Sequence, residues 1–112
     1  MIAFVSHHYA LPGKGNELKR RLDQTGKTMS NYPGLIVRYN LQAIDDPTHV
    51  TAVALWESAE ALDGWDNGPD RGRAVQQPQG EPVMDSSRPI FRVRFEVVGE
   101  YRPAQVAAKA RR

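Results

Sequence analysis

Two periodicities alternate along the chain, and their order constrains its fold more than any other feature of the sequence. Apolar residues at every second position predict a strand, whereas a stripe at every third or fourth position predicts a helix. In chain order the segments are a strand over Ile2–Leu11, a helix capped by Asn16 and ended by Pro33-Gly34, strands over Leu35–Ala43 and His49–Glu57 joined by the turn Asp45-Asp46-Pro47, a helix from Ala59 to the stop signal Asn67-Gly68-Pro69, and a strand over Ile90–Tyr101. This βαββαβ order predicts an α+β, ferredoxin-like fold, in which helices cover one face of a four-stranded antiparallel sheet.

The predicted strands carry apolar residues on both faces, so the second sheet face also needs a cover. In the first strand, Ala3, Val5, His7, Tyr9 and Leu11 share one face, and Ile2, Phe4, Ser6, His8 and Ala10 share the other. We expect the face of His7 to turn towards the helices, because it is otherwise apolar. Packing of the remaining face against a second copy would remove its exposure, which predicts a homodimer.

Length and composition indicate one small globular domain. The chain has 112 residues, which suffices for a single core, and we expect a domain over 1–101 followed by a flexible basic tail over 102–112. No run approaches the roughly 18 apolar residues of a membrane span, which excludes a spanning protein. The start of the chain resembles no signal peptide and cysteine is absent, so we expect a cytoplasmic protein.

Both tryptophans lie around one predicted strand-to-helix junction. There the chain reads Trp56-Glu57-Ser58-x-Glu60-Ala61-Leu62-x-x-Trp65-x-Asn67-Gly68-Pro69. Two indoles at such a junction form either a core corner or the wall of a pocket for a flat ligand. The motif, Pro33-Gly34-Leu35 and the order of elements resemble the antibiotic biosynthesis monooxygenase family across Met1–Tyr101. The resemblance implies a dimeric α+β barrel, and a function among cofactor-independent oxygenases, quinol-type oxygenases, haem-degrading enzymes and members without known activity.

The motif is also similar to that of the haem-degrading branch. There, Trp65 matches the tryptophan that stacks near haem, and the branch's asparagine on strand one falls at His7. The histidine that ligates iron falls near Arg73, Ala74 or Val75, none of which is histidine, although haem iron needs an axial donor. A haem site would therefore need a different ligand, with His7 as the candidate.

The branch that oxidises aromatic polyketides implies a role for the first tryptophan, Trp56. Its asparagine and tyrosine positions fall at Ala52 and Leu62, so that polar pair is missing here. Hydrogen-bonding groups from neighbouring strands are candidate replacements. These groups belong to His7, Tyr9, Asn40 and His49.

We therefore interpret the chain as a cofactor-independent monooxygenase that oxidises a polycyclic aromatic phenol or quinol with O₂. We expect its pocket between the sheet and the helices, with the segment Asp66–Pro89 as its lid. His7 is the expected base, because a neutral histidine can take up a phenolic proton near neutral pH. The expected catalytic residues are His7, Trp65 and Trp56, and the expected substrate-binding residues are Tyr9, Asn40 and Arg73. The alternatives are haem binding or degradation and a dimer that binds a small molecule without catalysis.

Several other classes lack support in the sequence. Adjacent His7 and His8 point to opposite faces of a strand, so they cannot share one metal ion, and no cluster shows metal-ligand spacing. Ser58 is better interpreted as a helix cap than as a nucleophile. The aromatic RNA-recognition signature is missing, so we expect no nucleic-acid partner.

Overall fold

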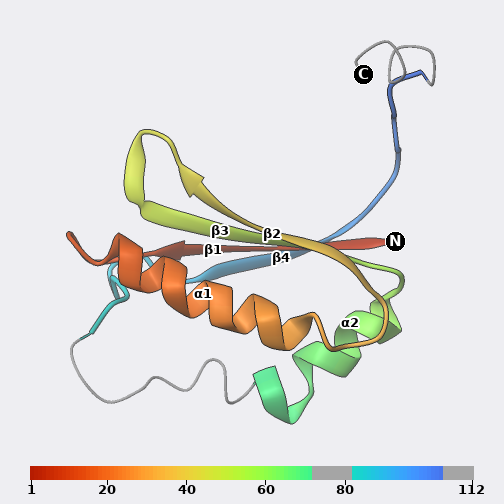
Figure 1. Cartoon of the computed structure of the whole chain (residues 1–112), viewed down its shortest axis with the longest axis horizontal. Coiled ribbons are helices and arrows are strands. Elements are labelled where there is room, and N and C mark those ends of the chain that lie inside the picture. The colour runs from red at the N-terminus through yellow and green to blue at the C-terminus, as the bar shows by residue number, and fades with distance from the viewer. Residues whose placement is uncertain (72–81, 105–112) are drawn as a thin grey trace.

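The computed structural model describes residues 1–71 and 82–104, and it confirms the predicted α+β fold (Figure 1). Its elements are β1 (Ile2–Tyr9), α1 (Gly15–Met29), β2 (Leu35–Ala43), β3 (Asp46–Trp56), α2 (Ala59–Asp66) and β4 (Phe91–Glu96). The predicted cap of α2 is correct, because the Ser58 hydroxyl accepts a hydrogen bond from the Ala61 amide. No helix in the described ranges is long and apolar enough to cross a membrane.

The start of α1 differs from the prediction of an Asn16 cap. The helix begins at Gly15, and Lys14 occupies the cap position without a side-chain hydrogen bond. Gly15 packs so closely on the β2–β3 hairpin that an added Cβ would lie 2.4 Å from the Pro47 carbonyl oxygen. This tertiary contact fixes the helix start one residue before the local capping signal.

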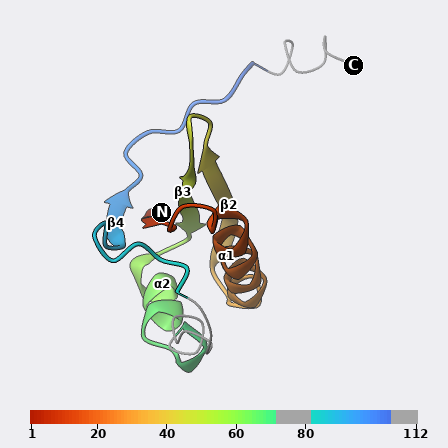
Figure 2. The ribbon, with the colours of Figure 1, turned by 90° about the vertical axis from the view of Figure 1, so that its left-hand side faces the viewer.

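The strands form one antiparallel sheet in the order β2-β3-β1-β4. Both helices lie on the same side of this sheet, α1 beneath β2 and β3 and α2 beside the other end of β3 (Figures 1 and 2). In the ladder between the central strands, Ile2 lies opposite Trp56 and His7 lies opposite Thr51. Opposed residues share a sheet face, so this register decides which side chains of β1 meet the helices.

The expected orientation of β1 is wrong: its even-numbered residues face the helices, and His7 faces away. Ile2 and Phe4 pack against a core cluster that contains Trp56, and Ala10, just beyond β1, joins a second cluster with Val50. Trp56 decides the orientation, because this indole is completely buried in a cluster that includes residues of both helices, and the register places Ile2 beside it. The alternation of β1 alone could not show this, because both of its faces are largely apolar.

The opposite sheet face, which we call the open face, has no cover in the described structure. It carries the exposed aromatic and aliphatic side chains of Tyr39, Leu41, Phe91 and Phe95. Several large apolar side chains exposed on one sheet face are typical of a protein interface.

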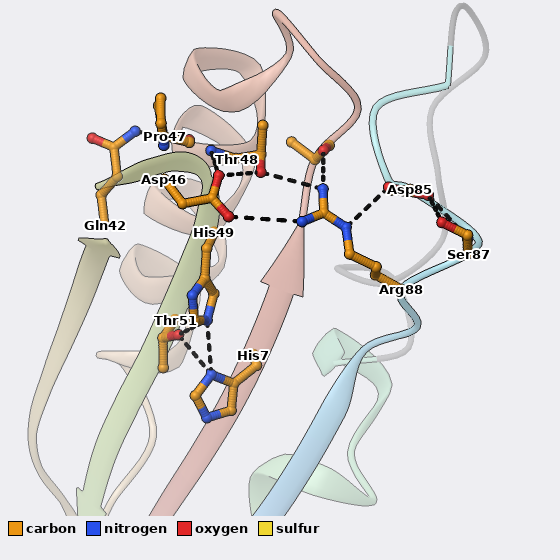
Figure 3. Close-up of polar contacts among 11 residues, drawn as sticks. His7, Gln42, Asp46, Pro47, Thr48, His49, Thr51, Asp85, Ser87 and Arg88 are labelled. Carbon is orange, nitrogen blue, oxygen red and sulfur yellow. Dashed lines mark hydrogen bonds and ion pairs between the residues drawn. The ribbon is translucent and has the colours of Figure 1, made fainter. Parts of the chain in front are cut away.

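The last part of the predicted lid is built into the fold. Val83 is buried against α1, its carbonyl accepts a hydrogen bond from the Leu11 amide, and Met84 forms a bridge with Ala10. Arg88 ties this segment to the hairpin, because its guanidinium contacts both Asp85 and Asp46 (Figure 3). Residues 82–89 are thus a fixed part of the domain, while residues 72–81 of the predicted lid lie outside the described residues.

One glycine sets the approach of the α1–β2 connection to α2. Gly34 has φ +91°, and a Cβ added there would lie 2.4 Å from the Ala61 Cβ. Any other residue would be strained by this backbone conformation and would also clash with the helix.

Candidate functional site

The residues predicted to form one site lie on two opposite faces of the sheet. His7 and Tyr9 lie on the open face, whereas Trp56, Trp65 and Asn40 lie on the face covered by the helices. Arg73 lies outside the described residues. The five described side chains therefore do not surround one pocket, and the two faces have to be considered separately.

On the open face, His7 forms a polar cluster with His49 and Thr51 (Figure 3). The His7 Nδ1 and His49 Nε2 atoms are 2.9 Å apart, and the Thr51 hydroxyl lies 3.0 and 3.1 Å from them. Tyr9 stacks on the His49 ring with centroids 4.6 Å apart. His49 is thus the half-buried partner of His7, and their hydrogen bond requires one of the two rings to be an acceptor.

The tryptophans pack as a core corner. Trp56 is fully buried and the exposed fraction of Trp65 is 2%. The Trp65 ring meets Tyr32 edge to face at 5.1 Å, and the Tyr32 hydroxyl donates to Asp70. The first of the two sequence-based interpretations, a core corner, therefore describes their packing, and their catalytic roles stay predictions.

The helix-covered face contains a polar strip between two apolar clusters. Along β1, Phe4 belongs to one cluster and Ala10, just past its end, to the other, while Ser6 and His8 lie between them. The register extends the strip across the sheet from Ser6 to Arg92 on β4 and, through Ala52, to Asn40 on β2. Polar side chains in the middle of a covered sheet face are unusual and mark a candidate site.

His8 is the titratable group at the centre of this strip, and its exposed fraction is only 6%. Its Nδ1 lies 3.3 Å from the Val50 carbonyl oxygen, so this nitrogen carries the proton and Nε2 is left as the acceptor. The pKa of His8 is lowered to about 4, mainly by burial and in smaller part by the nearby Arg92 and Arg38, while the hydrogen bond to Val50 acts in the opposite direction. His8 is therefore a neutral imidazole at neutral pH, with a nitrogen that can accept a proton.

Sequence reasoning missed His8 because it assigned β1 to the wrong face. The signal that identifies it is the pairing of Ile2 with Trp56, which the sequence does not display.

No group of three or more metal-ligating side chains occurs within residues 1–71 and 82–104.

Comparison with known proteins adds the family. The model of the antibiotic biosynthesis monooxygenase family matches residues 1–77, which is more than half of the chain. The chain belongs to this family. No match was found among curated protein sequences.

Solved structures of this family's fold superpose on most of the chain. The haem degrader MhuD of Mycobacterium tuberculosis, with two haems bound, is 23% identical, with a TM-score of 0.70 over 90% of this chain and 99% of MhuD. SnoaB of Streptomyces nogalater, a cofactor-independent oxygenase, is 15% identical, with a TM-score of 0.70 over 88% and 94% of the two chains. A putative antibiotic biosynthesis monooxygenase of Deinococcus radiodurans is 11% identical, with a TM-score of 0.75 over 93% and 99%. At these identities the likeness shows the fold alone.

Proposed function

We propose that this family member is a cofactor-independent monooxygenase that oxidises a polycyclic aromatic phenol, quinol or anthrone with O₂ on the helix-covered face. The observation that carries the proposal is His8, a buried neutral imidazole with an accepting Nε2 in a polar strip between two apolar clusters. Family membership and the likeness to SnoaB agree with this reaction class. His8 replaces His7 as the proposed base, because His7 lies on the other sheet face.

The reaction needs a base and an apolar environment but no external reductant. Nε2 of His8 takes the proton from the substrate, and the resulting electron-rich anion transfers electrons to O₂. For an anthrone, the ring CH₂ becomes C=O with one oxygen atom of O₂, and the other oxygen leaves as water with both hydrogens. Atoms and electrons balance without a cofactor.

Because the pKa of His8 is low in the free protein, we propose that proton transfer to His8 begins only once the substrate has bound. In the free protein, burial and two arginines disfavour the imidazolium. A substrate anion beside the ring adds an opposite charge, and this raises the pKa of the histidine. His8 becomes an effective base only in the complex.

Adjacent histidines on opposite faces provide a matched pair for the test. We expect O₂ uptake with an anthrone and no added cofactor, a loss of kcat of about 100-fold or more in His8→Gln, and little change in His7→Gln. The reverse pattern would refute the assignment of the base. Absence of O₂ uptake by the wild-type protein would refute the function, and a Soret band on addition of haem that disappears in His8→Ala would support the haem alternative.

We further propose that the open faces of two copies pack together in a homodimer. Support comes from the exposed Phe91, Phe95, Tyr39 and Leu41 side chains on that face. Light scattering should give the mass of a dimer for the wild type and of a monomer for Phe91→Asp. Ala59→Asp, at the exposed start of α2, should remain dimeric, and a monomeric wild type would refute the proposal.

A further inference from the structure

The side chain of Arg38 is a half-buried cation without a carboxylate partner among the described residues. Burial lowers its pKa to about 10, so it stays protonated at neutral pH. No described carboxylate oxygen lies within 4.0 Å of its guanidinium. A partly desolvated guanidinium without a counterion is unfavourable in isolation, and an anionic ligand would compensate its charge.

Neutral groups occupy only part of the hydrogen-bonding capacity of Arg38. Its Nε donates to the Asn40 Oδ1 atom at 3.0 Å, and Nη2 donates to the Leu22 carbonyl at 3.4 Å. Nη1 contacts the Met29 sulfur at 3.6 Å, and a thioether is a weak acceptor. A guanidinium has five N–H donors, so two of them remain for a ligand, which is the number that one carboxylate binds.

Arg38 lines a groove between α1 and β2 with a volume of about 430 Å³. The helix comes close to the arginine at Gly26, where an added Cβ would lie 3.3 Å from Nε. Among the described residues that line the groove, Asp23 is the only acidic one, and it forms an ion pair with Lys27 at 3.1 Å. Lys27 thus already compensates the negative charge of Asp23. The positive charge of Arg38 has no such partner among the described residues.

The groove adjoins the polar strip. Asn40 lines the groove, accepts from Arg38, and lies in the same cross-strand row as Ser6. Arg38 is also close enough to His8 to disfavour its protonation. A ligand with its aromatic part over the strip can therefore place an acidic substituent in the groove.

We propose that the groove between α1 and β2 binds a carboxylate of the substrate through Arg38, so that the substrate is an aromatic carboxylic acid. This inference rests on the proposed function for the location of the aromatic part. The volume of the groove lies within the range of ordinary ligand sites. Charge compensation by the substrate also explains how Arg38 and Arg92 can both lie near a histidine that has to accept a proton.

Binding without turnover tests this site. The probes are 2-naphthoate and the uncharged 2-naphthamide, titrated by calorimetry at constant ionic strength. We expect the naphthoate to bind at least 10-fold more tightly, and Arg38→Gln to abolish the difference while Arg20→Gln, on an exposed part of α1, retains it. Equal affinities in the wild type, or a preference that survives in Arg38→Gln, would overturn the proposal.

Nuclear magnetic resonance provides a second measurement that needs no variant. The Nη–H signals of Arg38, which include the donors left for a ligand, should shift with naphthoate and stay in place with naphthamide, and unshifted signals would overturn the proposal even if Arg38→Gln fails to fold. Carboxylate binding without O₂ uptake by any anthrone would leave this site intact and refute the oxygenase. Oxidation of a neutral anthrone with unchanged kcat/KM in Arg38→Gln, together with no preference for naphthoate, would refute the carboxylate site and leave the oxygenase function intact.

Discussion

Gly34 allows a strict test of the packing between the α1–β2 connection and α2. Its replacement by alanine places a residue with a side chain at φ +91°, which costs about 1–2 kcal/mol. The new Cβ would lie 2.4 Å from that of Ala61, and overpacking of this kind costs about 1–3 kcal/mol more. We expect Gly34→Ala to lower the free energy of unfolding by about 2–5 kcal/mol, a large fraction of a small domain's stability.

Two further variants separate the two contributions. Gly13 has φ +79° and nothing within 4 Å of an added Cβ, so Gly13→Ala reports the backbone cost alone. Ala61→Gly removes the atom that would clash, since the next contact of the new Cβ is 3.7 Å away. Combined with Gly34→Ala, it should restore about 1–3 kcal/mol relative to additivity.

Urea denaturation of the wild type, the three single variants and the double variant measures these quantities. A coupling energy near zero between positions 34 and 61 would refute the steric argument. A loss in Gly34→Ala no larger than that in Gly13→Ala would refute it as well, because both substitutions share the backbone cost.

Three other predictions concern stability. Because the pKa of His8 is lowered from 6.5 to about 4 in the folded state, the unfolded chain binds the proton first as the pH falls. Stability should therefore decrease between pH 6.5 and 4 by about 3 kcal/mol more in the wild type than in His8→Gln, measured by urea denaturation across this range. Gly64→Ala should stabilise the protein by about 0.5–1 kcal/mol, because Gly64 is an exposed position in α2 with open space around it. Arg88→Met should cost about 1–3 kcal/mol through its lost contacts to Asp85, Ala10 and Thr48, whereas Arg102→Met, at an exposed ion pair, should change the unfolding midpoint little.

The sequence predicts the elements well because their signals are local. Ser58 caps its helix as expected, and the apolar stripe through Leu18, Leu22 and Met29 becomes the buried side of α1. The start of α1 was missed because its cause is the distant contact between Gly15 and Pro47.

The site was harder to predict because it depends on the register between distant strands. The sequence favoured His7 over His8 as the base because the strand face of His7 is otherwise apolar, and the pairing of Ile2 with Trp56 reverses this assignment of faces. Asn40 was predicted as a substrate-binding residue and does border the polar strip. For Arg38, the sequence shows only that a charged residue lies in the middle of a strand, two positions from Asn40 and therefore on the same sheet face. Its lack of a carboxylate partner among the described residues is a property of the packed structure.

The position of β4 at one edge of the sheet has a consequence for assembly. This strand forms its ladder with β1 alone and follows a connection of more than 20 residues after α2, with Arg94 joining it to Asp63 and Asp66. Without β4, the first strand of the chain would present a row of unpaired backbone groups that matches the β4 of any other copy. Exchange of β4 between two copies would preserve every β1–β4 hydrogen bond, so this topology permits misassembly by domain swapping.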